Sequence, residues 1–199
     1  MIKLHDVCFS YGEAQVLKNL NHTFPDHGVF AIMGASGVGK STLLRLLCDL
    51  EDPSAGTVES THRKVAFAFQ EPRLLPWLNC ENNIKFVLPK EKQNSDIAKA
   101  LLQDFELEPY AKSLPSALSG GMKQRLSLAR ALAVGADLLL LDEPFSALDT
   151  ALKERVAPLI KAANPSGLTL VVTHDPRDAV LLGATVLELT PTSLHIAKV

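Results

Sequence analysis

One segment of this sequence has the residue types and spacing needed to hold nucleotide phosphates. Three glycines stand between the apolar run 29–33 and a lysine followed by two hydroxyl residues. Glycines let the backbone turn tightly and point its N–H groups at phosphate oxygens, and a helix that starts after the loop adds the positive end of its dipole. We expect Lys40 to reach the β and γ phosphates and the Ser41 hydroxyl to ligate Mg²⁺. The residues predicted to bind nucleotide here are Gly34, Ala35, Ser36, Gly37, Val38, Gly39, Lys40, Ser41 and Thr42.

Two adjacent carboxylates supply a second group suited to phosphate chemistry. Asp142 and Glu143 follow the apolar run Leu138–Leu141, which has the pattern of a buried strand. Because successive side chains on a strand point to opposite sides, the two acids should face different surroundings. We expect Asp142 to hold Mg²⁺, through water, and Glu143 to face the γ phosphate as the general base. An acid pair that only caps the next turn is the alternative, and the phosphate loop favours the catalytic interpretation.

A third segment, Leu118–Arg125, predicts another anion site of different design. Ser119, Gly120 and Gly121 stand at the start of a predicted helix, where backbone N–H groups and the serine hydroxyl are free to bind phosphate. Phosphate loops occur in kinases, small GTPases, helicases and transport ATPases, so the loop alone predicts a cofactor and not a function. The third segment is what distinguishes between these classes.

The Leu-Ser-Gly-Gly segment, with Gln124 three residues beyond Gly121, resembles the signature sequence of the ABC ATPases. The resemblance covers essentially the whole chain, because other elements of that family's pattern follow in the expected order. They are Tyr11, Gln70, the segment Ser146-Ala147-Leu148-Asp149, and His174.

The resemblance implies a role for each of these residues. Tyr11 would stack on the adenine, Gln70 would contribute to the magnesium and attacking-water site, and His174 would contact the γ phosphate. Asp149 would belong to the nucleotide site. Simpler roles stay open for Tyr11, which could cover the turn at Gly12, and for Asp149, which could cap a helix.

The same resemblance implies ligands and partners. ATP and Mg²⁺ would bind between two subunits of a head-to-tail homodimer or heterodimer, with Ser119, Gly120 and Gly121 of one subunit covering the γ phosphate on the other. A separate membrane permease, and for an importer a solute-binding protein, would complete the assembly on the inner, cytoplasmic face of the cell membrane. The segments 74–77, 173–175 and 178–180 are similar to ATPases of the nitrate, sulfonate and taurine importer group. In this setting Trp77 either docks a permease helix or packs in the core.

The elements that must position these residues alternate between strand and helix, which predicts an α/β fold with a mainly parallel sheet. The resemblance adds an N-terminal antiparallel β subdomain and a helical subdomain inserted at 70–125, a proline-punctuated stretch, with residues 1–69 and 126–199 forming the catalytic core. Strands are predicted at 2–9, 20–24, 29–33, 64–69, 138–141, 168–173 and 185–189. A helix is predicted from Ser41, with Pro53 and Gly56 marking its end, and further helices at 95–105, 122–134, 148–163 and 178–182.

Composition excludes several other classes. The 199 residues carry a net charge of −2, so we expect no nucleic-acid partner, and no run approaches the roughly 18 apolar residues that span a bilayer. The three cysteines form no C-x-x-C pair, which fits a reducing compartment. Two rival functions remain. A soluble ABC protein of DNA repair or translation would usually carry coiled-coil insertions or two ATPase units, and a small-molecule kinase would leave Leu118–Gln124 unexplained.

Overall fold

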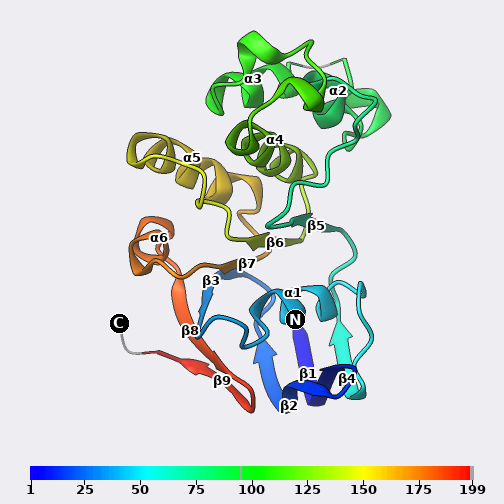
Figure 1. The fold of residues 1–199 in the computed structure, drawn as a ribbon, viewed down its shortest axis with the longest axis vertical. Coiled ribbons are helices and arrows are strands. Elements are labelled where there is room, and N and C mark those ends of the chain that lie inside the picture. The colour runs from blue at the N-terminus through cyan, green and yellow to red at the C-terminus, as the bar shows by residue number, and fades with distance from the viewer. Residues whose placement is uncertain (95, 198–199) are drawn as a thin grey trace.

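The computed structural model describes residues 1–94 and 96–197, and it places two sheets below a group of helices (Figure 1). The smaller sheet is antiparallel and has the strand order β2-β1-β4. Its strands are β1 (Ile2–Tyr11), β2 (Ala14–Phe24) and β4 (Ala55–Ser60). β2 begins six residues earlier than expected, directly after the turn at Gly12, and β4 was not predicted because five of its six residues are exposed. The antiparallel sheet at the N-terminal end is confirmed.

The larger sheet has the order β5-β6-β7-β3-β8-β9 and is parallel except for its last strand. Its strands are β3 (Gly28–Met33), β5 (Val65–Ala68), β6 (Leu138–Asp142), β7 (Leu168–Val172), β8 (Thr185–Thr190) and β9 (Ser193–Ile196). β6 and β7 are interior strands and are buried along their whole length, as their unbroken apolar sequences predict. The expected mainly parallel sheet is therefore confirmed.

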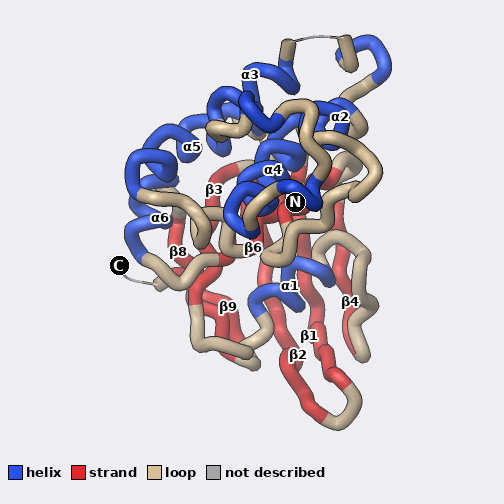
Figure 2. Tube along the Cα trace, turned by 45° about the horizontal axis from the view of Figure 1, so that its top comes forward, coloured by secondary structure: helices blue, strands red, loops and turns tan. Residues whose placement is uncertain are grey.

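Helices α2 to α5 gather at the end of the molecule opposite the antiparallel sheet, as Figure 2 shows. The helices are α1 (Lys40–Leu46), α2 (Cys80–Lys85), α3 (Ile97–Asp104), α4 (Gly120–Ala133), α5 (Thr150–Ala163) and α6 (Pro176–Leu182). Short 3₁₀ turns stand at Lys90–Lys92, Glu108–Tyr110 and Pro115–Ala117. The expected helix at 95–105 corresponds to α3, with residue 95 outside the described residues. None of the described helices has the length and apolar character needed to cross a membrane.

α1 is held between the two sheets, and this placement fixes the loop in front of it. Leu43 and Leu44 are fully buried and pack in one cluster with Leu17 of the antiparallel sheet and with Leu140 and Leu170 of the parallel sheet. Burying a leucine side chain contributes roughly 1.5–3 kcal/mol, so the helix is firmly docked on both sides. A second cluster joins α2 to α5 with the other face of the parallel sheet.

Candidate active site

The strand order brings four segments of the chain to one edge of the parallel sheet. β5, β6, β7 and β3 are neighbours, and their carboxyl ends lie side by side. Gln70 follows β5, His174 follows β7 and Gly34 follows β3. Asp142 is the last residue of β6, and Glu143 comes directly after it. Ligands of open α/β sheets bind at this edge. The residues predicted from distant parts of the sequence are therefore brought together by topology.

A cavity of about 340 Å³ opens at this edge. Its walls come from the phosphate loop, the start of α1, the first two strands and the ends of β5, β6 and β7. It is lined by Tyr11, Val16, Ser36, Gly37, Gly39, Lys40, Ser41, Thr42, Gln70, Asp142, Glu143 and Val172. Three predicted loop residues, Gly34, Ala35 and Val38, do not line it, and the Val38 side chain packs against the core instead.

The phosphate loop curls around its own lysine. Lys40 Nζ donates hydrogen bonds to the carbonyl oxygens of Gly34 and Ala35, at 3.0 and 2.8 Å. Gly39, just before α1, has a φ of +104°, and a Cβ there would stand 2.6 Å from the Val16 side chain. Only glycine fits this position, because both the backbone conformation and the space exclude a side chain.

Asp142 is a buried carboxylate, and one of its oxygens is free to bind a ligand. The residue is 4% exposed, and among the described residues its Oδ1 has no hydrogen-bond partner. Burial raises the pKa of Asp142, with a smaller opposing effect from the Ser41 hydroxyl beside it. A buried carboxylate next to a hydroxyl, with one oxygen unpaired, is a donor set that suits Mg²⁺, which binds proteins through one or two oxygens and keeps phosphates and waters as its other ligands.

Glu143 lines the same cavity and contacts His174, which is not itself among the lining residues. His174 Nδ1 lies 3.0 Å from Glu143 Oε2, and because an ionised carboxylate only accepts, the ring nitrogen donates this hydrogen bond. The Glu143 side chain is 14% exposed, whereas His174 is 75% exposed. The structure thus joins the two residues that the sequence placed 31 positions apart.

Tyr11 leans over the start of α1. Its hydroxyl lies 3.4 Å from Thr42 Oγ1 and accepts a hydrogen bond from Arg45 at 3.4 Å. The ring packs edge-on against Phe9, with the ring centroids 4.9 Å apart, and the residue remains 48% exposed at the cavity wall.

The predicted second anion site and Asp149 lie outside this cavity. The Ser119 hydroxyl caps α4 by accepting a hydrogen bond from the Met122 N–H at 3.3 Å. The Asp149 carboxylate caps α5 by accepting from the Leu152 N–H at 2.9 Å. Within one chain, Ser119, Gly120, Gly121 and Asp149 are therefore not among the residues that line the cavity.

Three residues of the site were not anticipated from the sequence. Val16 and Val172 line the cavity, and Arg45 holds the Tyr11 hydroxyl. Val16 lies in the part of β2 that was not predicted, and the apolar pair Val16-Leu17 directly after the Gly12 turn was the available signal. Arg45 stands one helical turn beyond Ser41 and Thr42, so helical periodicity could have placed it on the same face.

Comparison with known proteins decides the family. Residues 17–146 match the family described as "ABC transporter", which is well over half of the chain. The chain belongs to the ABC transporter family. It is 41% identical over 174 residues to the aliphatic sulfonates import ATP-binding protein SsuB 2 of Pseudomonas syringae pv. tomato, covering 86% of this chain and 75% of that protein. It is 44% identical over 187 residues to SsuB of Corynebacterium glutamicum, covering 90% and 76%.

A solved structure of the same family confirms the fold class. The dimeric ATP-binding cassette MJ0796, in a post-hydrolysis state bound to ADP and Pi, superimposes with a TM-score of 0.85 over 98% of this chain and 97% of that one, at 30% identity. The ABC-type α/β fold predicted for this chain is confirmed. As an ATP-binding subunit of an ABC transporter, the chain binds and hydrolyses ATP, and the kinase alternative is excluded.

Proposed function

We propose that this chain powers solute import by hydrolysing ATP at the carboxyl edge of its parallel sheet, in complex with a separate permease. The observation that carries the proposal is the contact of His174 with Glu143, whose side chain lines the cavity beside the phosphate loop. Its relatives named for aliphatic sulfonate import support the direction of transport and a sulfonate as the solute. A solute-binding protein would deliver that solute, and the subunit would lie on the cytoplasmic face of the membrane.

Mg²⁺ is the cofactor that this donor set fits. Ser41 at the end of the loop and Asp142 on β6 would be two of its protein ligands. Gln70, just after β5, would be the third. Held by these residues, Mg²⁺ would supply positive charge against the negative charge that develops on the transferred phosphate. Among the described residues no group of three or more His, Cys, Asp or Glu side chains gathers to hold a metal, so most ligands would come from ATP and water.

Glu143 would act as the general base. Its carboxylate lines the cavity and has one oxygen on His174, which leaves the other free to accept a proton from the attacking water. His174, largely exposed, would orient the carboxylate and contact the γ phosphate. Lys40 would exchange its two carbonyl partners in the loop for phosphate oxygens, and Tyr11, which is partly exposed, would stack on the adenine.

A composite site between two subunits would account for the residues that lie outside the cavity. A Cβ added at Gly120 would meet none of the described atoms within 4 Å, so the chain's own packing does not require a glycine there. Open backbone at a helix start suits the close approach of a phosphate from another subunit. We propose that Ser119, Gly120 and Gly121 cover the γ phosphate bound by the partner, with Asp149 near the same interface.

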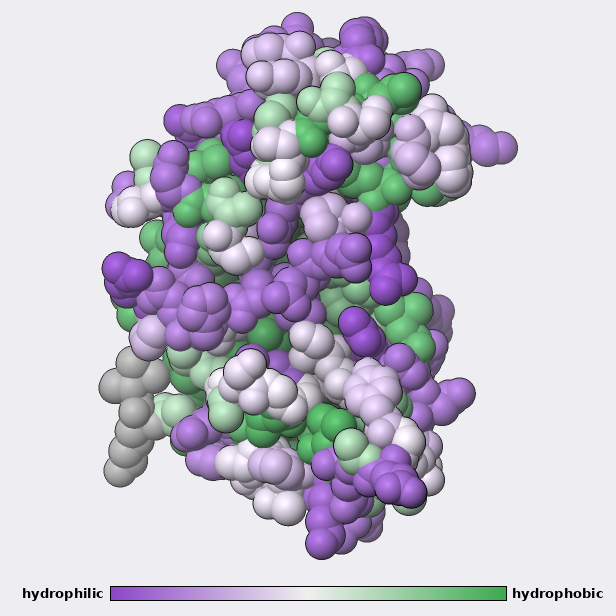
Figure 3. All heavy atoms as spheres, in the orientation of Figure 1, coloured by the Kyte–Doolittle hydropathy of each residue, from purple (hydrophilic) through white to green (hydrophobic). Residues whose placement is uncertain are grey.

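Residues 70–125 would form the helical unit that connects this chemistry to the permease. An apolar groove of about 430 Å³ opens between this unit and β5, and Figure 3 shows hydrophobic side chains at the right-hand edge between the helical end and the sheets. Leu75, Phe69 and Phe86 line the groove. α4 continues from this unit past residue 125 into the core, and its first residues belong to the signature segment 118–121. A movement of the groove would therefore be transmitted to that segment through α4.

Trp77 is not a core residue. It is 71% exposed, which excludes the core alternative that the sequence left open. We propose that it anchors the permease helix, because it follows Leu75 of the groove by two residues and exposed aromatic side chains are typical interface anchors.

The first test concerns turnover and binding separately. Glu143→Gln should keep ATP affinity and lower the hydrolysis rate by roughly 10²–10⁴-fold, as loss of a general base does. Lys40→Ala should weaken ATP binding by roughly 10–100-fold through loss of charged hydrogen bonds. Glu108→Gln, an exposed acid on a 3₁₀ turn, is the control. Near-normal hydrolysis by Glu143→Gln would remove it from the mechanism.

The second test concerns the permease contact. Trp77→Ala should change the unfolding free energy by less than about 0.5 kcal/mol, because the side chain is exposed, and should keep basal ATPase activity while losing co-purification with the permease. Leu114→Ala, another exposed apolar residue of the helical unit, should keep the association. Retained association in Trp77→Ala would place the docking surface elsewhere.

A further inference from the structure

We propose that Gln124 is a positioning residue that holds the backbone of Glu143 in its working conformation and connects it to α4. The proposal rests on the role of Glu143 given above. It adds a residue whose side chain lies outside the nucleotide cavity and acts only through Glu143.

The backbone of Glu143 needs external support. Its φ is +52°, in the left-handed region that residues with a Cβ rarely adopt. This turn directs the chain sharply away from β6 directly after Asp142, so that the side chain at 143 reaches His174. Uncommon backbone conformations persist only where neighbouring groups hold them in place.

Hydrogen bonds hold both sides of this residue. Its N–H donates to the Val172 carbonyl of β7 at 3.0 Å. Its carbonyl oxygen accepts from the Ser146 N–H at 3.2 Å, from Ser146 Oγ at 2.9 Å and from Gln124 Nε2 at 3.3 Å. The same Gln124 nitrogen donates to Ser146 Oγ at 2.8 Å, so one amide group ties the loop closed at two points.

Gln124 is the member of this network that comes from another element. Ser146 lies three residues after Glu143 and forms a local turn, whereas Gln124 lies on α4, 19 residues before Glu143. α4 begins at the Ser119 cap and carries Arg130 into the apolar groove beside β5. A shift of α4 would therefore displace the Glu143 carbonyl through its hydrogen bond with Gln124. The general base would then change position together with the helix.

Two pairs of variants test the proposal in the full-length protein. Gln124→Glu keeps the shape of the side chain and removes the donor. It should lower kcat by about tenfold or more while KM for ATP changes little, because a small displacement of a catalytic group lowers the reaction rate more than it lowers substrate affinity. Ser146→Ala should lower kcat in the same way, and Ser146→Thr, which keeps a hydroxyl, should restore most of it. Gln103→Glu on α3, at an exposed position, is the matched control and should leave kcat unchanged.

A double-mutant cycle separates positioning from a general structural role. If Gln124 acts through Glu143, adding Gln124→Glu to Glu143→Gln should cause no further loss in single-turnover rate. Additive losses, or a fall in melting temperature that accounts for the loss of activity, would overturn the proposal. If Glu143→Gln is slow but Gln124→Glu has a normal kcat, the positioning role of Gln124 is overturned and the role of Glu143 stands. If Glu143→Gln has a normal rate, Glu143 is not the general base and both proposals are overturned.

Discussion

Asp142 and Glu143 are adjacent in the sequence and have opposite surroundings. Asp142 still belongs to β6, is buried, and has a raised pKa because of that burial. Glu143 leaves the strand with a left-handed backbone and turns its side chain to His174. The buried acid next to Ser41 suits metal binding, and the acid that contacts His174 suits proton transfer. One change of backbone direction therefore separates two proposed roles.

Asp175, next to His174, gives a prediction about pH. Its side-chain hydrogen bonds with Arg177 lower the pKa of this carboxyl from 3.8 to about 2. Because the folded-state pKa lies below the unfolded value, ionised Asp175 stabilises the fold at higher pH, and this contribution is lost as pH falls from about 4 towards 2.

Arg177→Gln should raise the pKa of Asp175 towards its ordinary value, measured by following the carboxyl carbon with NMR during acid titration. Arg155→Gln, which removes an exposed arginine paired with Glu106, should leave the pKa of Asp175 unchanged. An unchanged pKa in Arg177→Gln would show that the guanidinium is not its cause.

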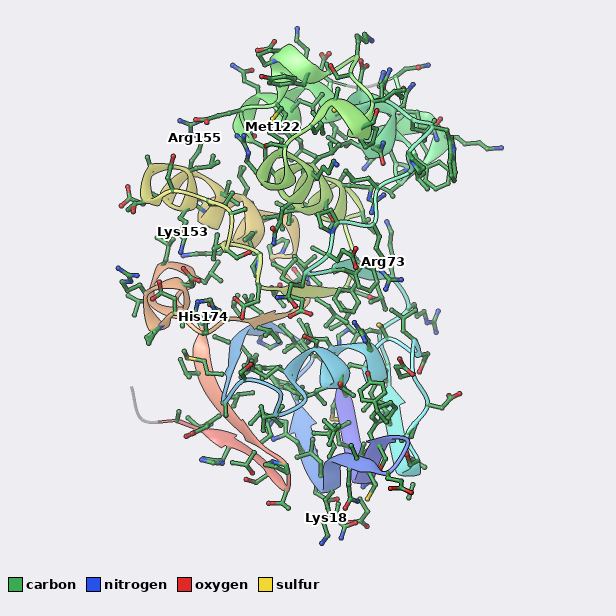
Figure 4. All side chains as sticks on the ribbon, viewed as in Figure 1. Lys18, Arg73, Met122, Lys153, Arg155 and His174 are labelled. Carbon is green, nitrogen blue, oxygen red and sulfur yellow. The ribbon has the colours of Figure 1, made fainter. Side chains whose placement is uncertain are left out.

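At the scale of elements, a partly buried ion pair connects the segment around His174 to α5. Lys153 Nζ on α5 donates to Asp178 Oδ1 on α6 at 2.8 Å, and Thr173 Oγ1 donates to Asp178 Oδ2 at 2.8 Å. Figure 4 shows Lys153 between α5 and α6, near His174. Thr173 Oγ1 also accepts from the Asp175 N–H at 3.1 Å, so the residues on both sides of His174 are anchored.

Lys153→Met should lower the free energy of unfolding by about 2–3 kcal/mol, because it leaves the Asp178 carboxylate buried without its cation. Denaturant titration measures this change. Lys161→Met, an exposed position on the same helix, should change stability by less than about 0.5 kcal/mol. Equal stability of the two variants would show that the Lys153–Asp178 pair contributes nothing.

The elements that bury many apolar side chains were predicted from the sequence more accurately than the exposed or very short ones. The central strands β6 and β7 and the helices α4 and α5 were predicted within a few residues, because unbroken apolar runs and clear caps mark them. β4 and α2 were missed, since β4 buries almost nothing and α2 spans only six residues. The phosphate loop and the acid pair follow from residue types and spacing. The left-handed turn at Glu143 and the Gln124 contact do not, because they arise from tertiary packing between distant segments.

At the scale of the whole molecule, a single chain holds an incomplete set of the proposed nucleotide contacts. The cavity contains the phosphate loop, Asp142 and Glu143, whereas Ser119 and its two glycines lie elsewhere on the surface, capping α4. Docking of each chain's signature segment onto the other's cavity would complete two sites at once. ATP would therefore join two copies of the nucleotide-binding surface.

Light scattering of Glu143→Gln with and without Mg²⁺ and ATP tests this claim most directly. The slow variant should hold ATP unhydrolysed, and its mass should double when nucleotide is added, because bound ATP bridges the two surfaces. Adding Ser119→Arg should abolish the doubling and leave ATP binding to the monomer intact, whereas Ser166→Arg, at the opposite edge of the sheet, should not affect it. A mass independent of ATP, or a dimer indifferent to Ser119→Arg, would contradict the composite site.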